Sequence, residues 1–504
     1  MWDGHSLVLR ADGGGRIGIC LNGSHFTELR ADENGRASLA FPFSPSGQAS
    51  LSVQASVLQA SDKAPSQVFS IRIGTPGISP DSEQATRPPD LDPIGVCVPA
   101  NVQPMAAEVA IIIPVYNAID ATRRCLDSVL ANSSGRCRLI VIDDASTDTA
   151  VAPMLAGYRG IPGVEIYSNP HNLGFTATVN RGMSLAGQAD VVLLNADTEV
   201  ASQWLTGLRR AAYASADTAT ATAVSDNAGA FSVPELEREN PLPQQWTFAQ
   251  AARAHWQGAG HAYPQLPTGN GFCMYIRRSS LNQLGLFDVD AFPQGYGEEN
   301  DFCQRACAVG YRHVIAGNVL VRHARSQSFG TERREALGRA GMQVLRDRWP
   351  NYESDVGRQL FSFERLVLDW RVRRIHASAA SHMPQPRLLR FCSLAEIAPM
   401  SGYDIHMLET TEDRLSLNDT SIGDGKSPGP LEWDLDRIPD LFEKYAYELL
   451  EIGQDMDSGL AKRLHDHGTR LGIPVLALAA GELATLAQRE AARHSLNRFG
   501  RVTR

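Results

Sequence analysis

Short apolar runs that end in polar turns constrain this chain more than any other feature. The clearest is VVLL at residues 191–194, which is followed at once by Asn195 and Asp197. Such a run, closed by a turn, is typical of a strand buried on both faces of a parallel sheet. Polar residues just beyond its carboxyl end face the crevice where open α/β sheets bind ligands. They are also common helix caps, so this segment alone leaves a binding site and a capping turn open.

The same pattern recurs from residue 109 onward, with helical stretches between the apolar runs. VAIIIPV, RLIVIDD and VEIYS predict strands at residues 109–115, 138–144 and 164–168. Residues 120–131 and 175–186 have the apolar spacing of helices. Strands that alternate with helices of this length predict right-handed βαβ units. The expected fold class is therefore α/β, with a doubly wound, mostly parallel sheet.

Three of the predicted strand ends bring polar side chains to one rim of this sheet. After the first, second and fourth strands these are Tyr116 and Asn117, Asp143 and Asp144, and Asn195 and Asp197. Convergence of three such ends favours a nucleotide site over three unrelated turns. Neither G-x-G-x-x-G nor G-x-x-x-x-G-K-[ST] opens the first helix, which counts against a dinucleotide site and a P-loop.

Length and composition limit the class of protein. The 504 residues allow about three domains, and 43% apolar residues allow real cores. A net charge of -9 argues against a nucleic-acid-binding protein. No apolar run is long enough to span a membrane, the N-terminus has no secretory-signal pattern, and the eight cysteines form no CxxC pair. We expect a cytoplasmic protein.

Five segments are predicted along the chain. Residues 1–80 carry short alternating runs and Gly-rich turns, typical of a small antiparallel β domain for packing or carbohydrate binding. Residues 81–107 have the composition of a linker. The main α/β domain spans 108–350, a helical connector 351–384, and a small or incomplete α/β module of unknown role 385–504.

Two details of the last segments are open to test. The C-terminal module is expected to contain strands at RLLRFCSL and IPVLALAA, with helices near residues 441–452 and 459–471. Residues 361–375 are amphipathic and basic, which is typical of a surface helix but also allows a peripheral contact with the inner face of the plasma membrane.

The order and spacing of five motifs resemble those of family 2 glycosyltransferases, inverting enzymes with the GT-A fold. The motifs are IIIPVYN, VIDDASTD, NPHNLGFTATVN, LLNADTEV and GYGEENDFCQRACAVGYR. The resemblance runs from about residue 109 to 348, and LLNADTEV is similar to the bacterial rhamnosyltransferase and O-antigen branch. It implies a hexosyltransferase with a nucleotide-diphosphate sugar donor, Mg²⁺ or Mn²⁺, and a glycan or lipid-linked acceptor in cell-surface polysaccharide synthesis.

On the donor side, the resemblance assigns two strand ends to the nucleotide base. Pro114, Tyr116 and Asn117 are expected to lie against the base, where an aromatic face offers stacking. The alternative for Asn117 is a plain helix N-cap. An acid at the end of the second strand is expected to accept a hydrogen bond from the pyrimidine N–H. Asp144 is preferred for this contact, with Asp143 close behind.

The N-x-G-F-x(4)-N pattern is expected beside the donor ribose and phosphates. Its members are Asn172, Gly174 and Asn180, and the glycine permits a close backbone approach.

The resemblance also implies a metal site and a catalytic base. Asp197 is the main expected metal ligand, helped by Asn195 where many relatives have a second acid, and His323 is expected to complete the metal sphere. Glu299 occupies the position of the base that removes the acceptor proton. Asp301 is expected to pair with Arg305 one helical turn later and to be structural.

Two other functions were weighed against this one. A sugar nucleotidyltransferase needs a Gly-rich phosphate loop after the first strand, where this chain has PVYNAIDA. A non-catalytic glycan-binding or scaffold protein would not need the combination of Asp144, Asp197, Glu299 and His323. A metal-dependent inverting glycosyltransferase is therefore the expected function.

Overall fold

A computed structural model provides the tertiary structure. It describes residues 108–133, 137–260, 263–324, 331–360, 362–392, 402–411, 414–419, 431–434, 438–479, 483–495 and 499, together with the backbone of six N-terminal strands. The predicted linker, residues 81–107, lies outside the described residues.

The N-terminal strands form two antiparallel sheets. β1 (Ser6–Arg10) pairs with β4 (Arg36–Ala40). The second sheet has the order β3-β2-β5-β6, made of β2 (Arg16–Leu21), β3 (Ser24–Arg30), β5 (Ala49–Ser56) and β6 (Gln67–Ile73). The role of this region stays a prediction.

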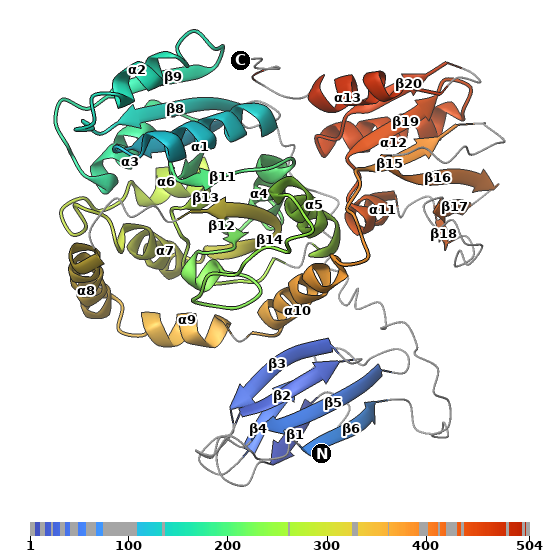
Figure 1. The fold of residues 1–504 in the computed structure, drawn as a ribbon, viewed down its shortest axis with the longest axis horizontal. Coiled ribbons are helices and arrows are strands. Elements are labelled where there is room, and N and C mark those ends of the chain that lie inside the picture. The colour runs from blue at the N-terminus through green and yellow to red at the C-terminus, as the bar shows by residue number, and fades with distance from the viewer. Residues whose placement is uncertain are drawn as a thin grey trace.

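An eight-stranded mixed sheet forms the centre of the main domain (Figure 1). Its order is β11-β14-β12-β13-β10-β7-β8-β9. The strands are β7 (Val109–Val115), β8 (Cys137–Asp143), β9 (Val164–Ser168), β10 (Asp190–Leu194), β11 (Thr198–Glu199), β12 (Thr218–Ser225), β13 (Cys273–Ile276) and β14 (Arg312–His323).

The sheet is mostly parallel, as expected, with two strands that run in the opposite direction. β10, β7, β8 and β9 are parallel to one another, and so are β12 and β14. β13 is antiparallel to both of its neighbours, and β11 is antiparallel to β14. The sheet is therefore mixed, because β13 begins at the edge where the parallel strands end and runs back between them.

Helices cover both faces of this sheet, as the doubly wound prediction requires. One face is covered by α1 (Ile119–Asn132), α2 (Val151–Ala156), α4 (Trp204–Ala212) and α5 (Phe248–Gly258). The other is covered by α3 (Phe175–Leu185), α6 (Arg278–Leu284) and α7 (Glu298–Ala308). A 3₁₀ turn, η1 (Gly229–Phe231), follows β12.

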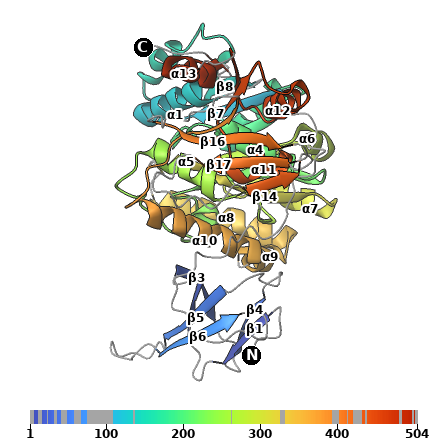
Figure 2. The same cartoon turned by 90° about the vertical axis from the view of Figure 1, so that its right-hand side faces the viewer.

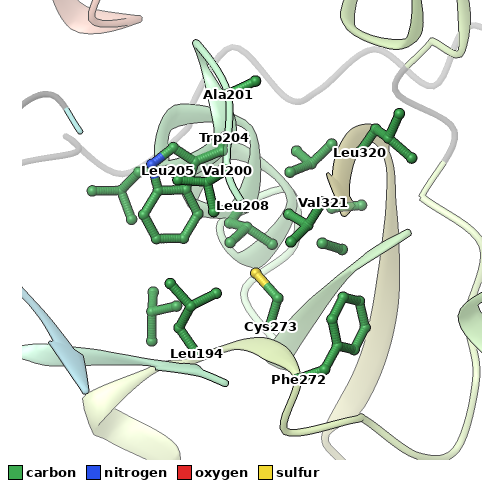
Figure 3. Packing of buried hydrophobic residues seen from close by; sticks show 14 of the residues in the cluster. Leu194, Val200, Ala201, Trp204, Leu205, Leu208, Phe272, Cys273, Leu320 and Val321 are labelled. Carbon is green, nitrogen blue, oxygen red and sulfur yellow. The ribbon is translucent and has the colours of Figure 1, made fainter. Parts of the chain in front are cut away.

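The side chains of β7 alternate between two cores. Val109 and Ile111 pack with α1, whereas Ala110 and Ile112 pack with α3, and all four are fully buried. In the first core, Trp204 of α4 lies over the end of β10 (Figure 3). Each fully buried aliphatic side chain of this kind contributes about 1.5–3 kcal/mol to stability.

Three helices follow β14: α8 (Thr331–Arg348), α9 (Tyr352–Leu360) and α10 (Phe363–Ser378). The described apolar residues of α10, among them Leu368 and Trp370, are buried against the main domain. Arg365 is also buried, pairs with Asp369 at 3.0 Å, and donates to the carbonyl of Ser232. The described apolar side chains of this stretch therefore pack against protein, as in an ordinary surface helix, and its peripheral membrane contact stays a prediction.

The C-terminal module is a second α/β unit, with sheet order β18-β17-β16-β15-β19-β20. Its strands are β15 (Arg387–Phe391), β16 (Asp404–Thr411), β17 (Arg414–Asp419), β18 (Leu431–Asp434), β19 (Leu449–Gly453) and β20 (Val475–Leu478). Its helices are α11 (Ile438–Tyr445), α12 (Ser458–Arg470) and α13 (Leu486–Ser495).

The helix predicted near residues 441–452 is wrong in its second half. α11 ends at Tyr445, Ala446 has a φ of 51°, and the following LLEIG is the strand β19. Leu449 and Leu450 are buried on opposite faces of the sheet, which only a strand allows for consecutive residues.

The module packs against α5 of the main domain (Figure 2). Arg253 pairs with Glu448 at 2.9 Å, and Trp256 Nε1 donates to the carbonyl of Ala446 at 3.2 Å. Within the described part of the chain, no helix is long and apolar enough to cross a membrane.

Candidate active site

One edge of the central sheet collects the predicted site residues. β12 runs in the same direction as β10, because both are antiparallel to β13. The carboxyl ends of β7, β8, β10, β12 and β14 therefore meet at one edge, together with the loop that opens β13. This edge carries residues 116–118, 143–148, 195–197, 226–228 and 269–272, and His323.

Asp197 and His323 lie side by side at this edge. β11 pairs with the end of β14, and the register sets Thr198 opposite His323. As a result, His323 Nε2 lies 3.4 Å from Asp197 Oδ1. His323 Nδ1 lies 3.0 Å from the carbonyl oxygen of Asn227, which can only accept a hydrogen bond.

This arrangement leaves two acceptors facing each other. Because Nδ1 carries the proton, the lone pair of the neutral imidazole is on Nε2, on the side of the Asp197 carboxylate. A second ring proton or a metal ion between these two atoms would make their approach favourable. A carbonyl that fixes the free ring nitrogen of a ligand histidine is the usual support of a metal-binding imidazole.

The protein offers a small, open ligand set for such a cation. In the described residues no group of three or more His, Cys, Asp and Glu side chains is placed to hold a metal ion. Mg²⁺ is commonly bound by one or two protein ligands plus water and substrate phosphates, so Asp197 and His323 fit the expected Mg²⁺ or Mn²⁺. The backbone of Asn195, the expected helper ligand, is held by protein. Its N–H donates to the Phe272 carbonyl at 2.9 Å, and its carbonyl accepts from Thr198 Oγ1 at 2.7 Å.

The first two residues of α7 are adjacent carboxyls, of which Glu298 is buried and Glu299 is partly exposed. Glu298 is 2% exposed, and its Oε2 accepts the Gly297 N–H at 3.0 Å. Burial raises the pKa of Glu298 well above its ordinary value, and the neighbouring charge of Glu299 raises it further. Protonation is therefore favoured at Glu298, and the hydrogen bond between the two side chains lowers the pKa of Glu299.

Glu299 has the environment of a tuned base. Burial raises the pKa of its carboxyl, while the hydrogen bond from Glu298 opposes that shift. Its Oε2 atom is buried and has no hydrogen-bond partner in the structure. A buried, unpartnered carboxylate oxygen is available to accept a proton.

A short loop joins this base to the Asp197–His323 pair. The backbone of Gly271 faces the Glu299 carboxyl and favours its charged form, which lowers its pKa. The next residue, Phe272, stacks on the His323 ring, with centroids 5.2 Å apart and planes 17° apart. Phe272 also accepts the Asn195 N–H through its carbonyl. The Asp197–His323 pair, the Asn195 turn and Glu299 are thus in contact with two consecutive residues.

The Asp144 carboxylate is bound by protein donors. Its carboxylate accepts three hydrogen bonds, from Asn169 Nδ2 at 2.7 Å, Leu173 N at 2.8 Å and Gly174 N at 3.0 Å. This set ties the loop before α3 to the end of β8. Asp143 accepts one, from Ser146 N at 3.0 Å. The geometry thus favours a structural role for Asp144 and leaves Asp143 with more room for a ligand.

Asn117 is neither free for a ligand nor an N-cap. The N-cap of α1 is Ala118, without a side-chain cap. Asn117 Oδ1 accepts the Asp148 N–H at 3.0 Å, and its own N–H donates to Ser146 Oγ at 2.8 Å. Asn117 therefore joins the loops after β7 and β8. Pro114 and Tyr116 are partly exposed beside it.

The N-x-G-F-x(4)-N pattern contacts protein where a donor was expected. Asn172 is exposed. Gly174 has a φ of 84°, and a Cβ there would overlap the Pro293 carbonyl oxygen. The close approach predicted for this glycine is therefore made to another loop. Both ends of the Asn180 amide bind the backbone of Phe287.

Asp301 is structural, as expected. Its Oδ2 accepts from Arg305 Nε at 2.9 Å, and its Oδ1 accepts from Trp349 Nε1 at 3.0 Å. Sequence reasoning missed Asn227, which orients His323. Its signal was present, because SDN follows the strand run TATATAV just as polar residues follow the other strands.

The role of Asp144 predicts the effect of its neutralisation. Asp144→Asn replaces one acceptor oxygen by an NH₂ group that faces a backbone N–H, so we expect a loss of about 1–3 kcal/mol in the free energy of unfolding. Urea denaturation measures this loss. Asp143→Asn is the control, since Asn keeps one oxygen for its single partner. Equal stabilities of the two variants would contradict the structural role.

The sequence is similar to known glycosyltransferases. A family model described as Glycosyl transferase family 2 matches residues 110–285. The uncharacterized glycosyltransferase YibD of Escherichia coli (strain K12) is 32% identical over 93 residues, which are 18% of this chain and 27% of that protein. Glycosyltransferase GlyA of Streptococcus pneumoniae serotype 4 is 27% identical over 90 residues, 18% of this chain and 13% of that protein. The chain thus spans about a quarter of the length of the first relative and less of the second.

Two solved structures are also similar. A mannosyltransferase, PcManGT from Pyrobaculum calidifontis, in complex with GDP-Man and Mn²⁺, has 18% identity and a TM-score of 0.36, over 54% of this chain and 75% of that one. GalNAc-T7 with UDP, GalNAc and Mn²⁺ has 16% identity and a TM-score of 0.37, over 56% and 59%. The family match and the sequence relatives together identify a domain of the glycosyltransferase family 2 enzymes around residues 110–285.

Proposed function

We propose that this chain transfers a sugar from a nucleotide-diphosphate donor to a hydroxyl of a glycan or lipid-linked acceptor, with inversion and with a divalent metal ion. The observation that carries the proposal is the Gly271–Phe272 loop, which contacts both the Glu299 carboxylate and the His323 ring. This contact keeps a proton acceptor and a candidate cation site at the same edge of the sheet, as displacement at an anomeric carbon requires.

Glu299 is the proposed base. As the acceptor oxygen attacks the anomeric carbon from the face opposite the leaving group, its proton passes to the Glu299 carboxylate, and the bond to the diphosphate oxygen breaks. Glu298 holds the Glu299 side chain by a hydrogen bond from its own protonated carboxyl. Exclusion of water from this pair strengthens the interaction of the base with the acceptor proton.

Asp197 and His323 are the proposed metal ligands; they would hold Mg²⁺ or Mn²⁺, which would supply positive charge against the charge that develops on the leaving diphosphate. The support is their 3.4 Å separation and the orientation of the His323 ring by Asn227. Since the protein contributes two side chains, the remaining positions are open to diphosphate oxygens and water.

The nucleotide base is proposed to lie between the ends of β7 and β8. Tyr116 offers an aromatic face, and Asp143 is the proposed acceptor for the ring N–H, because Asp144 is engaged by three protein donors. The sequence favoured Asp144 for this contact, and the proposal assigns it to Asp143 instead.

The pathway is proposed from the resemblance of LLNADTEV to the rhamnosyltransferase and O-antigen branch. Cell-surface polysaccharide synthesis and a cytoplasmic location follow from that resemblance. We propose residues 108–350 as the catalytic unit, with the parts before and after it serving other, unassigned roles.

Metal-dependent nucleotide binding is the first expected outcome. UDP or dTDP is expected to bind more tightly with Mn²⁺ than without, and Asp197→Asn is expected to weaken the Mn²⁺-dependent binding by roughly tenfold or more. Isothermal titration calorimetry measures both. Glu199→Gln, two residues away and paired with Arg322 at 3.7 Å, is the control. Metal-independent or absent binding would favour the non-catalytic scaffold alternative.

The base assignment makes a second prediction. Glu299→Gln keeps the shape of the side chain but removes the proton acceptor, so we expect kcat to fall by about 10²–10⁴-fold. The affinity for UDP or dTDP is expected to stay unchanged. Release of nucleotide diphosphate in a donor screen measures turnover, and calorimetry measures affinity. Turnover by this variant near the wild-type rate would show that another group is the base.

The pH dependence of kcat follows from the carboxyl pair. The base acts when ionised, so kcat rises with pH through the pKa of Glu299, which burial raises above the ordinary value of about 4.3. Glu298→Ala removes the hydrogen bond that lowers this pKa, so the rise is expected to move to higher pH. Glu298→Gln keeps a hydrogen-bond donor, so the rise of kcat is expected to stay at the wild-type pH. A shift of equal size in both variants would contradict the role of Glu298.

A further inference from the structure

The segment that leads into the catalytic helix consists of turns that are held mainly from outside. Residues 286–297 contain no helix or strand and end at Gly297, the N-cap of α7. Phe287 and Phe292, the large side chains that anchor this segment, are both buried. The position of Glu298 and Glu299 therefore depends on whatever fixes these turns.

α3 supplies the fixing contacts. Asn180 Nδ2 donates to the Phe287 carbonyl at 2.8 Å, and Asn180 Oδ1 accepts the Phe287 N–H at 3.1 Å. The hydroxyl of Thr176, which is fully buried, donates to the Phe292 carbonyl. A planar amide that satisfies both backbone groups of one residue fixes that residue in orientation as well as in place.

The loop before α3 adds a close van der Waals contact. Gly174 lies so close to Pro293 that a Cβ would overlap the Pro293 carbonyl oxygen. The same glycine donates its N–H to Asp144 at 3.0 Å, which ties it to the end of β8. The turns before Glu298 are thus attached, through Gly174, to the end of β8. The same strand end carries Asp143, the acid proposed to bind the nucleotide base.

The last contact is made to Gly297, directly before the carboxyl pair. A Cβ at Gly297 would overlap the Phe292 ring, so this ring lies directly against the residue that precedes Glu298. Thr176 holds the backbone of the same phenylalanine. A displacement of Phe292 would therefore be passed to the start of α7, where Glu298 and Glu299 lie.

From these contacts we infer that Thr176 and Asn180 are positioning residues for the Glu299 base, and that the N-x-G-F-x(4)-N pattern acts on the acceptor side of the reaction. Their side chains bind the backbone of residues 287 and 292, so neither is directed at a donor. The inference rests on the proposed function only where it speaks of catalysis; the mechanical link between α3 and residues 286–297 is independent of it.

Two variants and one control test the inference. Asn180→Ala removes both contacts to Phe287, and Thr176→Val removes a hydroxyl at nearly constant shape. Ser184→Ala is the matched control, because Ser184 lies on the exposed side of the same helix and donates only to the Asn180 carbonyl, at 2.9 Å. For each variant, kcat and donor KM, calorimetric affinity for UDP or dTDP with Mn²⁺, and amide hydrogen exchange are measured.

We expect both variants to lower kcat by about 10- to 100-fold, as displacement of a reacting group by an ångström does. Donor KM and nucleotide affinity are expected to stay within about twofold of wild type. Amides of residues 286–297 are expected to exchange faster, while Ser184→Ala behaves as wild type. If amides throughout the chain exchange faster in Asn180→Ala, that variant is destabilised as a whole. The inference is then tested by Thr176→Val alone.

Weakened nucleotide affinity with unchanged kcat would overturn the inference in favour of a donor contact. Unchanged exchange of residues 286–297 in both variants would overturn it as well. If the wild-type chain transfers no sugar from any donor, the proposed function fails, but the exchange measurements still test the link between α3 and the turns.

Discussion

Burial of the parallel strands on both faces is the constraint on which the rest of this domain depends. β10 and all of β7 except Pro114 are buried, and their side chains alternate between two cores. A strand of this kind has no exposed face on which to place a functional group. Polar chemistry is therefore confined to the residues just beyond the strand ends, and because the strands are parallel, those ends share one edge. The site follows from the way the core is built.

Carboxylates at this edge have different roles although their chemistry is the same. Asp144 accepts three hydrogen bonds from protein and holds a loop, whereas Asp197 lies 3.4 Å from His323 and is a proposed metal ligand. Glu298 and Glu299 are adjacent in sequence, yet burial and mutual repulsion push the first toward its protonated form and leave the second as the acceptor. Partners and solvent access, more than residue type, divide structural acids from reactive ones.

The contacts of α3 give the proposed chemistry a mechanical basis. Asp144 joins the end of β8 to the loop before α3, and Asn180 joins α3 to the turns before α7. The proposed donor and acceptor sides are thus connected through a single helix, and on the other side of the site Phe272 stacks on His323. A site held from both directions by buried contacts keeps its reacting groups in place before substrate arrives, which lowers the reorganisation needed during reaction.

The sequence by itself determined the α/β class, the strands at 109–115 and 191–194, and the strand ends where site residues belong, because apolar runs and turn residues are local signals. It did not determine that β13 runs back through the sheet, that LLEIG is a strand, or that Asp144 and Asn180 bind protein. Those outcomes depend on which distant backbone groups come within hydrogen-bond distance. Only the tertiary structure decides that, since an identical carboxylate or amide serves a loop or a ligand according to what packs against it.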